Sequence, residues 1–428
     1  MPLFAFLVPG VTMHTTGLTA DRITGLYEGD GLAAALADAR TRTLAIYAHL
    51  DLAAIEFPCI PTVNPPLWEL AHVAWFQELW CVRSRGSRHE LRPSLLPSSD
   101  ALLNSSTVPH DSRWHLDYPP PERLLRYMRE TFDATQEALA HTREDKGYFF
   151  RLALYHEDMH GEALLMTLQT LGLAAPPIEA RDPPAADLEP ASDVFFAGGE
   201  FDQGTWKADF AFDNEREAHR VRVAPFALAS RPVTQGEFAA FVEETGAALP
   251  SHWRRDGARW QARRFDRWLA LDTSAPMLHA SLDDALGYCR WARRRLPTEA
   301  EWEFAARNGG RMDRFPWGDA AVAGGEALDF RHRGPSLALA DPLPSTSGLR
   351  QMLGGVWEWT STRFAPYPGF HADPYRDYSQ PWFHTHHVLR GGSFATRSRL
   401  IHNRFRNFYT AERSDAFAGF RTCALESR

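Results

Sequence analysis

The stretch GYFFRLALYHEDMHGEALLMTLQTLG, residues 147–172, decides the architecture of the first half of the chain. Its apolar residues recur at spacings of three and four without an internal proline, which predicts an amphipathic helix over residues 147–171 that ends at Gly172. The centre reads HEDMHGE, so His156 and His160 lie one turn apart on one face of that helix. A helix with such an apolar face needs partner helices to cover it.

Three segments upstream have helical patterns of their own. Alanine and leucine recur at helical spacing from Gly31 to about Ile55. A second segment follows Pro65 and Pro66, which suit a helix start because the missing N–H has no partner there anyway. A third helix is expected over residues 121–141. Four long helices joined by loops predict an all-α four-helix bundle.

The length and composition predict two domains. A chain of 428 residues and 48.3 kDa exceeds what one hydrophobic core usually supports. Residues 174–192, AAPPIEARDPPAADLEPAS, have the composition of a linker. The bundle is therefore expected over residues 20–173 and a second domain over residues 193–428.

The expected second domain has a different character from the bundle. Short strand-like runs, HRVRVAPFALA at 219–229 and HHVLRGGSFA at 386–395, alternate with turn-forming glycine and proline, and helices are expected near 234–245 and 281–307. These features predict a loop-rich α+β domain. The fold class is thus multidomain, an all-α bundle followed by an α+β domain.

The bulk properties exclude several classes of partner. A net charge of −8 and a pI near 6.1 give no basic surface for nucleic acid. The opening MPLFAFLVPGVTM is a poor signal peptide, is too short to span a bilayer, and leaves Met13 as an alternative start. The cysteines form no CxxC pair, which favours a reducing cytoplasm over a disulfide framework. We therefore expect a cytoplasmic protein without membrane or nucleic-acid partners.

Three histidines form a candidate metal site. His156 and His160 supply two ligands from one helix, and His72, in WELAHVAWF, lies mid-helix on an apolar surface where an unpaired imidazole would be costly. Three inward histidines predict a facial metal site with open positions. Glu162 is not expected to be a ligand, because it points roughly 200° around the helix from His160. A surface coincidence of the histidine pair is the alternative, and three histidines suit zinc as well as iron.

Five strings in the second half resemble a known fold. They are RLPTEAEWEFAAR (295–307), FPWGD (315–319), GGVWEWT (354–360), LRGGSF (389–394) and AGFR (418–421). Together they resemble the formylglycine-generating-enzyme-like fold of the C-type-lectin-like class, over residues 193–428. The resemblance implies that Trp302, Trp357 and Trp359 are core residues. The founding enzyme holds copper with two cysteines after its RGGSF string, but no cysteine lies between Phe394 and Arg406 here. Its cysteine oxidation is therefore not expected.

With the HEDMHGE helix added, residues 31–428 resemble the ergothioneine-type sulfoxide synthases. In that family a DinB-like bundle that carries three iron-binding histidines is joined to this second fold. The resemblance implies an Fe(2+) cofactor held by His72, His156 and His160. It also implies small-molecule substrates: hercynine (the betaine of histidine), a thiol donor and O₂.

The resemblance also implies substrate-binding and catalytic residues in the second domain. Asn407 and Phe408 match the family's string near the trimethylammonium group of hercynine. A catalytic tyrosine is expected near the iron. The candidates are Tyr367, Tyr375, Tyr378 and Tyr409, of which Tyr375 and Tyr378 in the PYRDYS loop are selected.

Two departures from the family concern the donor. The family typically has glutamine, near the substrate imidazole, where this chain has Met159, and an aspartate and an arginine where it has Tyr409 and Arg413. Loss of the acidic group implies a donor without an ammonium. NPPLWELAHVAWFQELW, residues 64–80, resembles the selenoneine synthases, whose donor is a selenosugar. We therefore expect carbon–selenium bond formation on hercynine, with three alternatives. They are a carbon–sulfur bond from cysteine or γ-glutamylcysteine, a zinc-dependent DinB-type thiol transferase, and a non-catalytic binding protein.

Overall fold

The computed structural model describes residues 29–52, 57–84, 91–142, 147–187, 190–206, 210–311, 313–319, 325–341, 345 and 347–425. The chain divides into two compact units, of which the first ends at Glu179 and the second begins at Ala180. This boundary lies inside the expected linker, and the alternative start at Met13 lies outside the described residues. Among the helices of the described ranges, none is long and apolar enough to cross a membrane.

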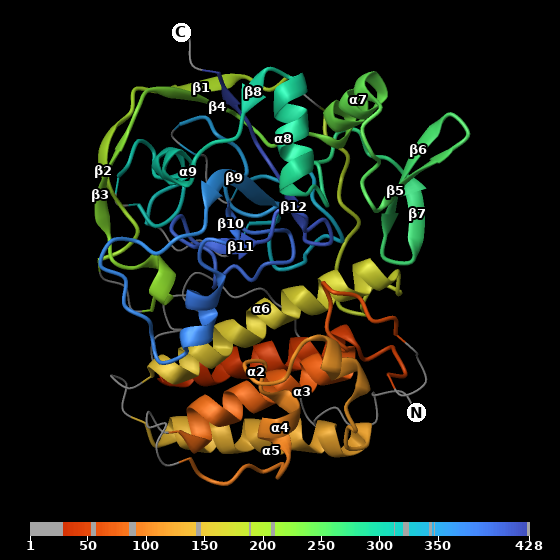
Figure 1. Cartoon of the computed structure of the whole chain (residues 1–428), viewed down its shortest axis with the longest axis vertical. Helices are drawn as coiled ribbons and strands as arrows, with labels where there is room; N and C mark the ends of the chain where they lie inside the picture. The colour runs from red at the N-terminus through yellow and green to blue at the C-terminus, as the bar shows by residue number, and fades with distance from the viewer. Residues whose placement is uncertain are drawn as a thin grey trace. The chain divides into compact units, whose positions relative to one another are not determined.

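The first unit is a four-helix bundle (Figure 1). Its long helices are α2 (Gly29–Ile46), α3 (Pro66–Gln77), α5 (Pro121–Ala140) and α6 (Tyr148–Leu171). Around the bundle, α2 packs on α6, α6 on α3, α3 on α5 and α5 on α2. The shorter elements are the π-helix η3 (Glu78–Arg83), α4 (Ser99–Leu103) and the 3₁₀ helix η4 (Asp111–His115). The predicted bundle is confirmed.

The helix ends follow the sequence signals with one exception. Pro66 opens α3 as predicted, and α6 ends at Gly172, whose φ of 67° is left-handed. The first helix is shorter than expected: α2 ends at Ile46 rather than near Ile55. Tyr47 and Leu50 are still buried in the turn that follows, so the apolar spacing continues past the end of the helix.

The second unit is a loop-rich α+β domain built around four sheets in the described ranges (Figure 1). One sheet has the order β1 (Asp193–Phe196), β4 (Phe226–Ala229), β13 (Cys423–Ala424) and β8 (Arg294–Arg295). A second has the order β11 (Asn407–Tyr409), β10 (His387–Arg390), β9 (Trp357–Arg363) and β12 (Ala418–Gly419). The others are the hairpin β2 (Gly199–Gln203) and β3 (His219–Val223), and the meander β5 (Trp253–Asp256), β6 (Arg259–Arg264) and β7 (Arg267–Ala270).

The second unit has two helices where the sequence predicted one near 281–307. The helices are α7 (Gln235–Thr245), α8 (Leu282–Trp291) and α9 (Glu299–Ala306). The single helix expected near 281–307 is wrong, because strand β8 and Pro297 separate α8 from α9. Each of these helices starts with its own capping box, which satisfies backbone N–H groups that a continuous helix would bond internally.

The predicted aromatic core of the second unit is confirmed. Trp302, Trp357 and Trp359 are at most 2% exposed. The indole N–H of Trp302 donates to Glu358 Oε2 at 2.7 Å, and that of Trp359 donates to the Ala280 carbonyl at 2.7 Å. A buried indole keeps its N–H paired in this way, so these residues fix the core geometry around β9 and α9.

Candidate metal centre

Three histidines meet inside the helical unit. His72 comes from α3, and His156 and His160 come from α6, which packs against α3. One ring nitrogen from each lies within 4.8 Å of the other two. In the described part of the chain, this is the one group of three or more histidine, cysteine, aspartate or glutamate side chains that could hold a metal ion. Glu162, on the same helix as two of the histidines, is not part of the group.

His72 is held by a stack and a hydrogen bond. Its Nδ1 lies 2.8 Å from the Leu103 carbonyl, to which it donates. The Trp68 ring stacks on its face with centroids 4.7 Å apart and planes 7° apart. Arg113 covers the Trp68 ring at 4.0 Å, and the Trp68 N–H donates to the Leu102 carbonyl. The ring orientation of His72 is therefore set before any ligand binds.

His156 and His160 are restrained differently. The Phe76 ring lies flat on His156, with centroids 3.6 Å apart and planes 6° apart. His160 Nδ1 lies 2.7 Å from Oε1 of the buried Glu69. Because Nδ1 of His72 and of His160 is engaged in a hydrogen bond, Nε2 is the atom that each of these two rings offers.

Burial keeps two of the three imidazoles neutral. Burial, together with the nearby His160, lowers the pKa of His72 and of His156 well below the ordinary value of 6.5. The neutral imidazole is the form that ligates a metal ion. The three oriented imidazoles come from two helices and fit a divalent cation with positions left open for other ligands.

Four of the five predicted substrate residues lie in the second unit, where three of them share one strand. Asn407, Phe408 and Tyr409 form β11, which pairs antiparallel with β10. Phe408 stacks on Phe364 with centroids 4.1 Å apart and planes 13° apart. Met159, by contrast, is in the helical unit, on α6 between the two histidines.

Both candidate tyrosines belong to the aromatic cluster around Phe408. The rings of Tyr378 and Phe408 meet edge to face at 6.1 Å, and Tyr375 lies 6.3 Å from Tyr378. Tyr378 also stacks on Phe212 at 4.2 Å. Burial raises the pKa of Tyr378 well above 10. Its phenol therefore carries its proton at neutral pH.

Arg413 has a partner that the sequence did not reveal. Its Nε and Nη2 donate to the two carboxylate oxygens of Asp415 at 2.6 and 2.8 Å. The same guanidinium lies over the Tyr409 ring at 4.6 Å. A bidentate carboxylate pair satisfies the charge of the guanidinium inside the protein.

Sequence reasoning also missed the residues that orient the histidines. Trp68, Glu69 and Phe76 all belong to the string WELAHVAWF, in which His72 was identified. The signal was available, since Glu69 and Phe76 lie three and four residues from His72 and so share its helix face. A glutamate in an otherwise apolar stripe is expected to be buried, and a buried carboxylate needs a hydrogen-bond donor as its partner.

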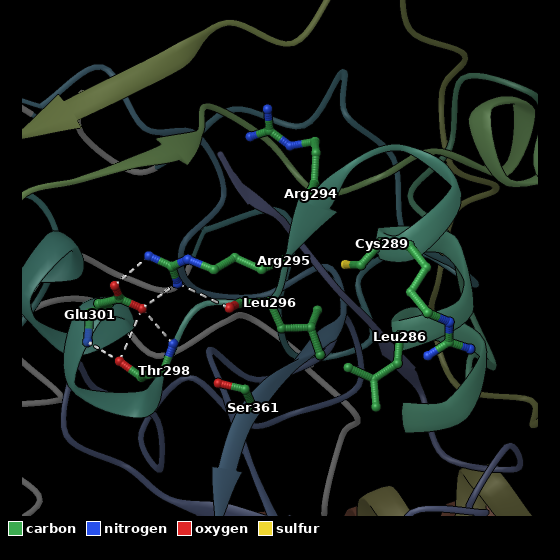
Figure 2. A pocket seen from close by; sticks show the side chains of 9 residues that line it. Leu286, Cys289, Arg294, Arg295, Leu296, Thr298, Glu301 and Ser361 are labelled. Atoms are coloured by element: carbon green, nitrogen blue, oxygen red, sulfur yellow. Dashed lines mark hydrogen bonds and ion pairs between the residues drawn. The ribbon is translucent and has the colours of Figure 1, made fainter. Parts of the chain in front are cut away.

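The second unit also contains a pocket of about 410 Å³, shown in Figure 2. It is lined by Leu286, Cys289, Arg290, Arg294, Arg295, Leu296, Thr298, Glu301 and Ser361. Burial raises the pKa of the Cys289 thiol to about 12, so the pocket holds no thiolate nucleophile. Two of the lining arginines, Arg294 and Arg295, form ion pairs with Asp193 and Glu301. None of the predicted site residues lines this pocket.

Comparison with known proteins matches both units. The family described as DinB superfamily matches residues 35–164, and the Sulfatase-modifying factor enzyme 1-like domain matches residues 179–425. A hercynine oxygenase of Mycolicibacterium thermoresistibile is 35% identical over 429 residues, covering 91% of this chain and 94% of the relative. The chain belongs to the hercynine oxygenase family.

Other relatives agree with this membership. The hercynine oxygenase of Mycobacterium tuberculosis is 34% identical over 427 residues and covers 91% of this chain and 97% of the relative. The formylglycine-generating enzyme of Streptomyces coelicolor is 32% identical but covers only 60% of this chain. Hercynine oxygenases are non-haem iron oxidoreductases, so the expectation that the chain is an enzyme of that class is confirmed. The expected fold class is confirmed as well.

Proposed function

We propose that this chain is an iron(II)-dependent oxygenase that uses O₂ to join a chalcogen atom to the imidazole of hercynine. The observation that carries the proposal is the pre-oriented triad of His72, His156 and His160, in a chain related over 91% of its length to hercynine oxygenases. When bound, iron(II) supplies the site for O₂ and electrons for its reduction. The protein supplies orientation, proton delivery and exclusion of water.

The helical unit provides the metal ligands in a form that suits this chemistry. The three imidazoles hold the ion, and the stacked rings of Trp68 and Phe76 keep two of them from rotating. Because these faces are aromatic and buried, water reaches the ligand nitrogens from few directions. A zinc-dependent transferase would use the same ligands but would need no O₂.

The second unit provides candidates for hercynine binding. A trimethylammonium group is received by aromatic faces, and Phe408 belongs to a cluster of such rings with Phe364 and Tyr378. Asn407 precedes Phe408 on the same strand and offers an amide for hydrogen bonding. Tyr375 or Tyr378 donates the proton, and the raised pKa of Tyr378 keeps its phenol protonated until a base accepts the proton.

Two donors are candidates for the chalcogen atom. The relatives favour sulfur, because one partial relative, from Schizosaccharomyces pombe, is described as ergothioneine biosynthesis protein 1. With a thiol such as cysteine or γ-glutamylcysteine, the products are a sulfoxide and water. One oxygen atom of O₂ enters the sulfoxide, and the other leaves as water with the hydrogens of the imidazole C–H and of the thiol. The residues that correspond to the family's donor-binding positions, Tyr409 and Arg413, favour a selenosugar. Asp415 already pairs with Arg413, which leaves that guanidinium less available to a donor carboxylate, and Tyr409 offers a hydroxyl.

Anaerobic reconstitution with iron(II) tests the proposal. The enzyme is mixed with hercynine and either a selenosugar or a cysteine-type thiol, O₂ is admitted, and the products are identified by mass. A selenium adduct formed with the selenosugar alone supports the selenosugar donor, and a sulfoxide from the thiol supports the sulfur donor. No O₂ uptake with either donor overturns the oxygenase proposal.

A further inference from the structure

Glu69 is a buried acid placed directly beside the metal site. It lies on α3, three residues before His72 and on the same helix face. Its side chain is 2% exposed, and Oε1 accepts a hydrogen bond from His160 Nδ1 on α6 at 2.7 Å. A carboxylate buried to this degree is costly unless a partner compensates it. Its partner here is one of the proposed metal ligands.

The hydrogen bonds of His72 and His160, compared with each other, show what Glu69 adds. His72 donates its Nδ1 hydrogen to a neutral carbonyl, that of Leu103, whereas His160 donates to a carboxylate. A carboxylate acceptor fixes the tautomer as a carbonyl does, and it also makes the imidazole a stronger ligand. The ring of His160 is therefore both oriented and electronically enriched by Glu69.

The surroundings of Glu69 leave its charge available to the site. Arg113 attracts Glu69 electrostatically, but its guanidinium is occupied by the Val108 carbonyl and Asn64 Oδ1 and covers the Trp68 ring. Burial, and then the charge of Glu69, raise the pKa of Tyr47 well above 10, so this neighbour stays neutral. A divalent cation on the triad would be stabilised by the negative charge of Glu69, which is hydrogen-bonded to the ligand His160.

We infer that Glu69 is a positioning residue for the metal: it holds the Nδ1-protonated tautomer of His160, aims Nε2 at the ion, and raises the affinity of the triad for a divalent cation. The inference rests on the proposed function, because it concerns the same metal site. It goes beyond that proposal by assigning a role to a residue that does not touch the ion.

The test measures metal affinity rather than turnover. Metal-free full-length protein is titrated anaerobically with iron(II), and separately with cobalt(II), whose visible absorption reports the ligand geometry. Glu69→Gln keeps the size of the side chain and removes its charge, and Glu69→Asp restores the charge at a shorter reach. Glu78→Gln is the matched control, because Glu78 is another buried carboxylate of this unit, bonded instead to Tyr127 and Ser94.

The expected result is a loss of about 10- to 100-fold in affinity for both metals in Glu69→Gln, with partial recovery in Glu69→Asp. Glu78→Gln should stay within about threefold of the parent, and the cobalt spectrum should change only in the Glu69 variants. Parent-like affinity and spectrum in Glu69→Gln would overturn the inference while leaving the proposed function standing. Failure of the parent chain itself to bind one ion would overturn both.

Discussion

Replacement of two triad histidines should flatten the pH dependence of stability of the metal-free protein. Burial keeps His72 and His156 neutral in the folded chain, while in the unfolded chain each titrates near pH 6.5. As pH falls through that value, the unfolded chain takes up two protons that the folded chain does not. Because the folded pKa values are depressed, stability is lost on acidification, and it is lost below the unfolded pKa.

The size of the effect follows from this proton count. Between about pH 7.5 and pH 5.5 each such histidine removes about 1.4 kcal/mol of unfolding free energy, so the pair removes about 2.7 kcal/mol. The His72→Gln, His156→Gln double variant lacks both groups, and its acid-induced loss should be smaller than that of the parent by this amount. The remaining histidines are present in both proteins, so the comparison isolates the contribution of His72 and His156.

Urea unfolding of the metal-free proteins at the two pH values, followed by helical circular dichroism, measures this difference. Saturating the parent with metal should raise its stability by a similar amount at both pH values, because His72 and His156 hold no protons in the folded chain for the ion to displace. Equal acid-induced losses in the parent and the double variant would mean that burial does not keep His72 and His156 neutral in the folded chain.

Three further predictions concern the second unit. Phe408→Leu should raise KM for hercynine by about 2- to 30-fold with a smaller change in kcat, because a cation–π contact is worth about 0.5–2 kcal/mol; steady-state O₂ uptake measures KM, and an unchanged KM contradicts the prediction. Asp415→Asn should free Arg413 and shift donor preference toward a carboxylate-bearing thiol, which competition between the two donors followed by mass analysis reveals; an unchanged ratio argues against a role for the pair in donor choice. Trp302→Phe should cost about 1–3 kcal/mol of unfolding free energy, because the buried Glu358 carboxylate loses a donor, and urea unfolding of the variant checks this.

The sequence was sufficient for the helices because their signals are local. Periodic apolar residues, the proline pair before α3 and the glycine after α6 each act within a few residues of where the structure shows their effect. The prediction of one helix over 281–307 was wrong because it also relied on a local pattern. Two amphipathic stretches adjoin there, and the apolar spacing continues across β8 although Pro297 interrupts the backbone pattern.

The site was predictable only in part. His156 and His160 could be paired from their spacing, and His72 from the cost of burying an imidazole without a partner. Contacts that join distant segments, such as Glu69 to His160 or His72 to the Leu103 carbonyl, depend on how α3, α4 and α6 pack. Arg413 and Asp415 are close in sequence, but their bidentate geometry depends on the loop that carries them.

A single-turnover measurement of O₂ consumption decides whether this chain is an oxygenase: the iron(II)-loaded protein is prepared anaerobically and O₂ is then admitted. With hercynine and a chalcogen donor both present, we expect one O₂ consumed for each hercynine converted to an adduct with a new bond from an imidazole carbon to sulfur or selenium. The His156→Ala variant, prepared in the same way, should consume none. Adduct formation by the zinc-loaded protein without O₂, or O₂ uptake that continues unchanged in the His156→Ala variant, would show that the triad is not the site of an iron-dependent oxygenase.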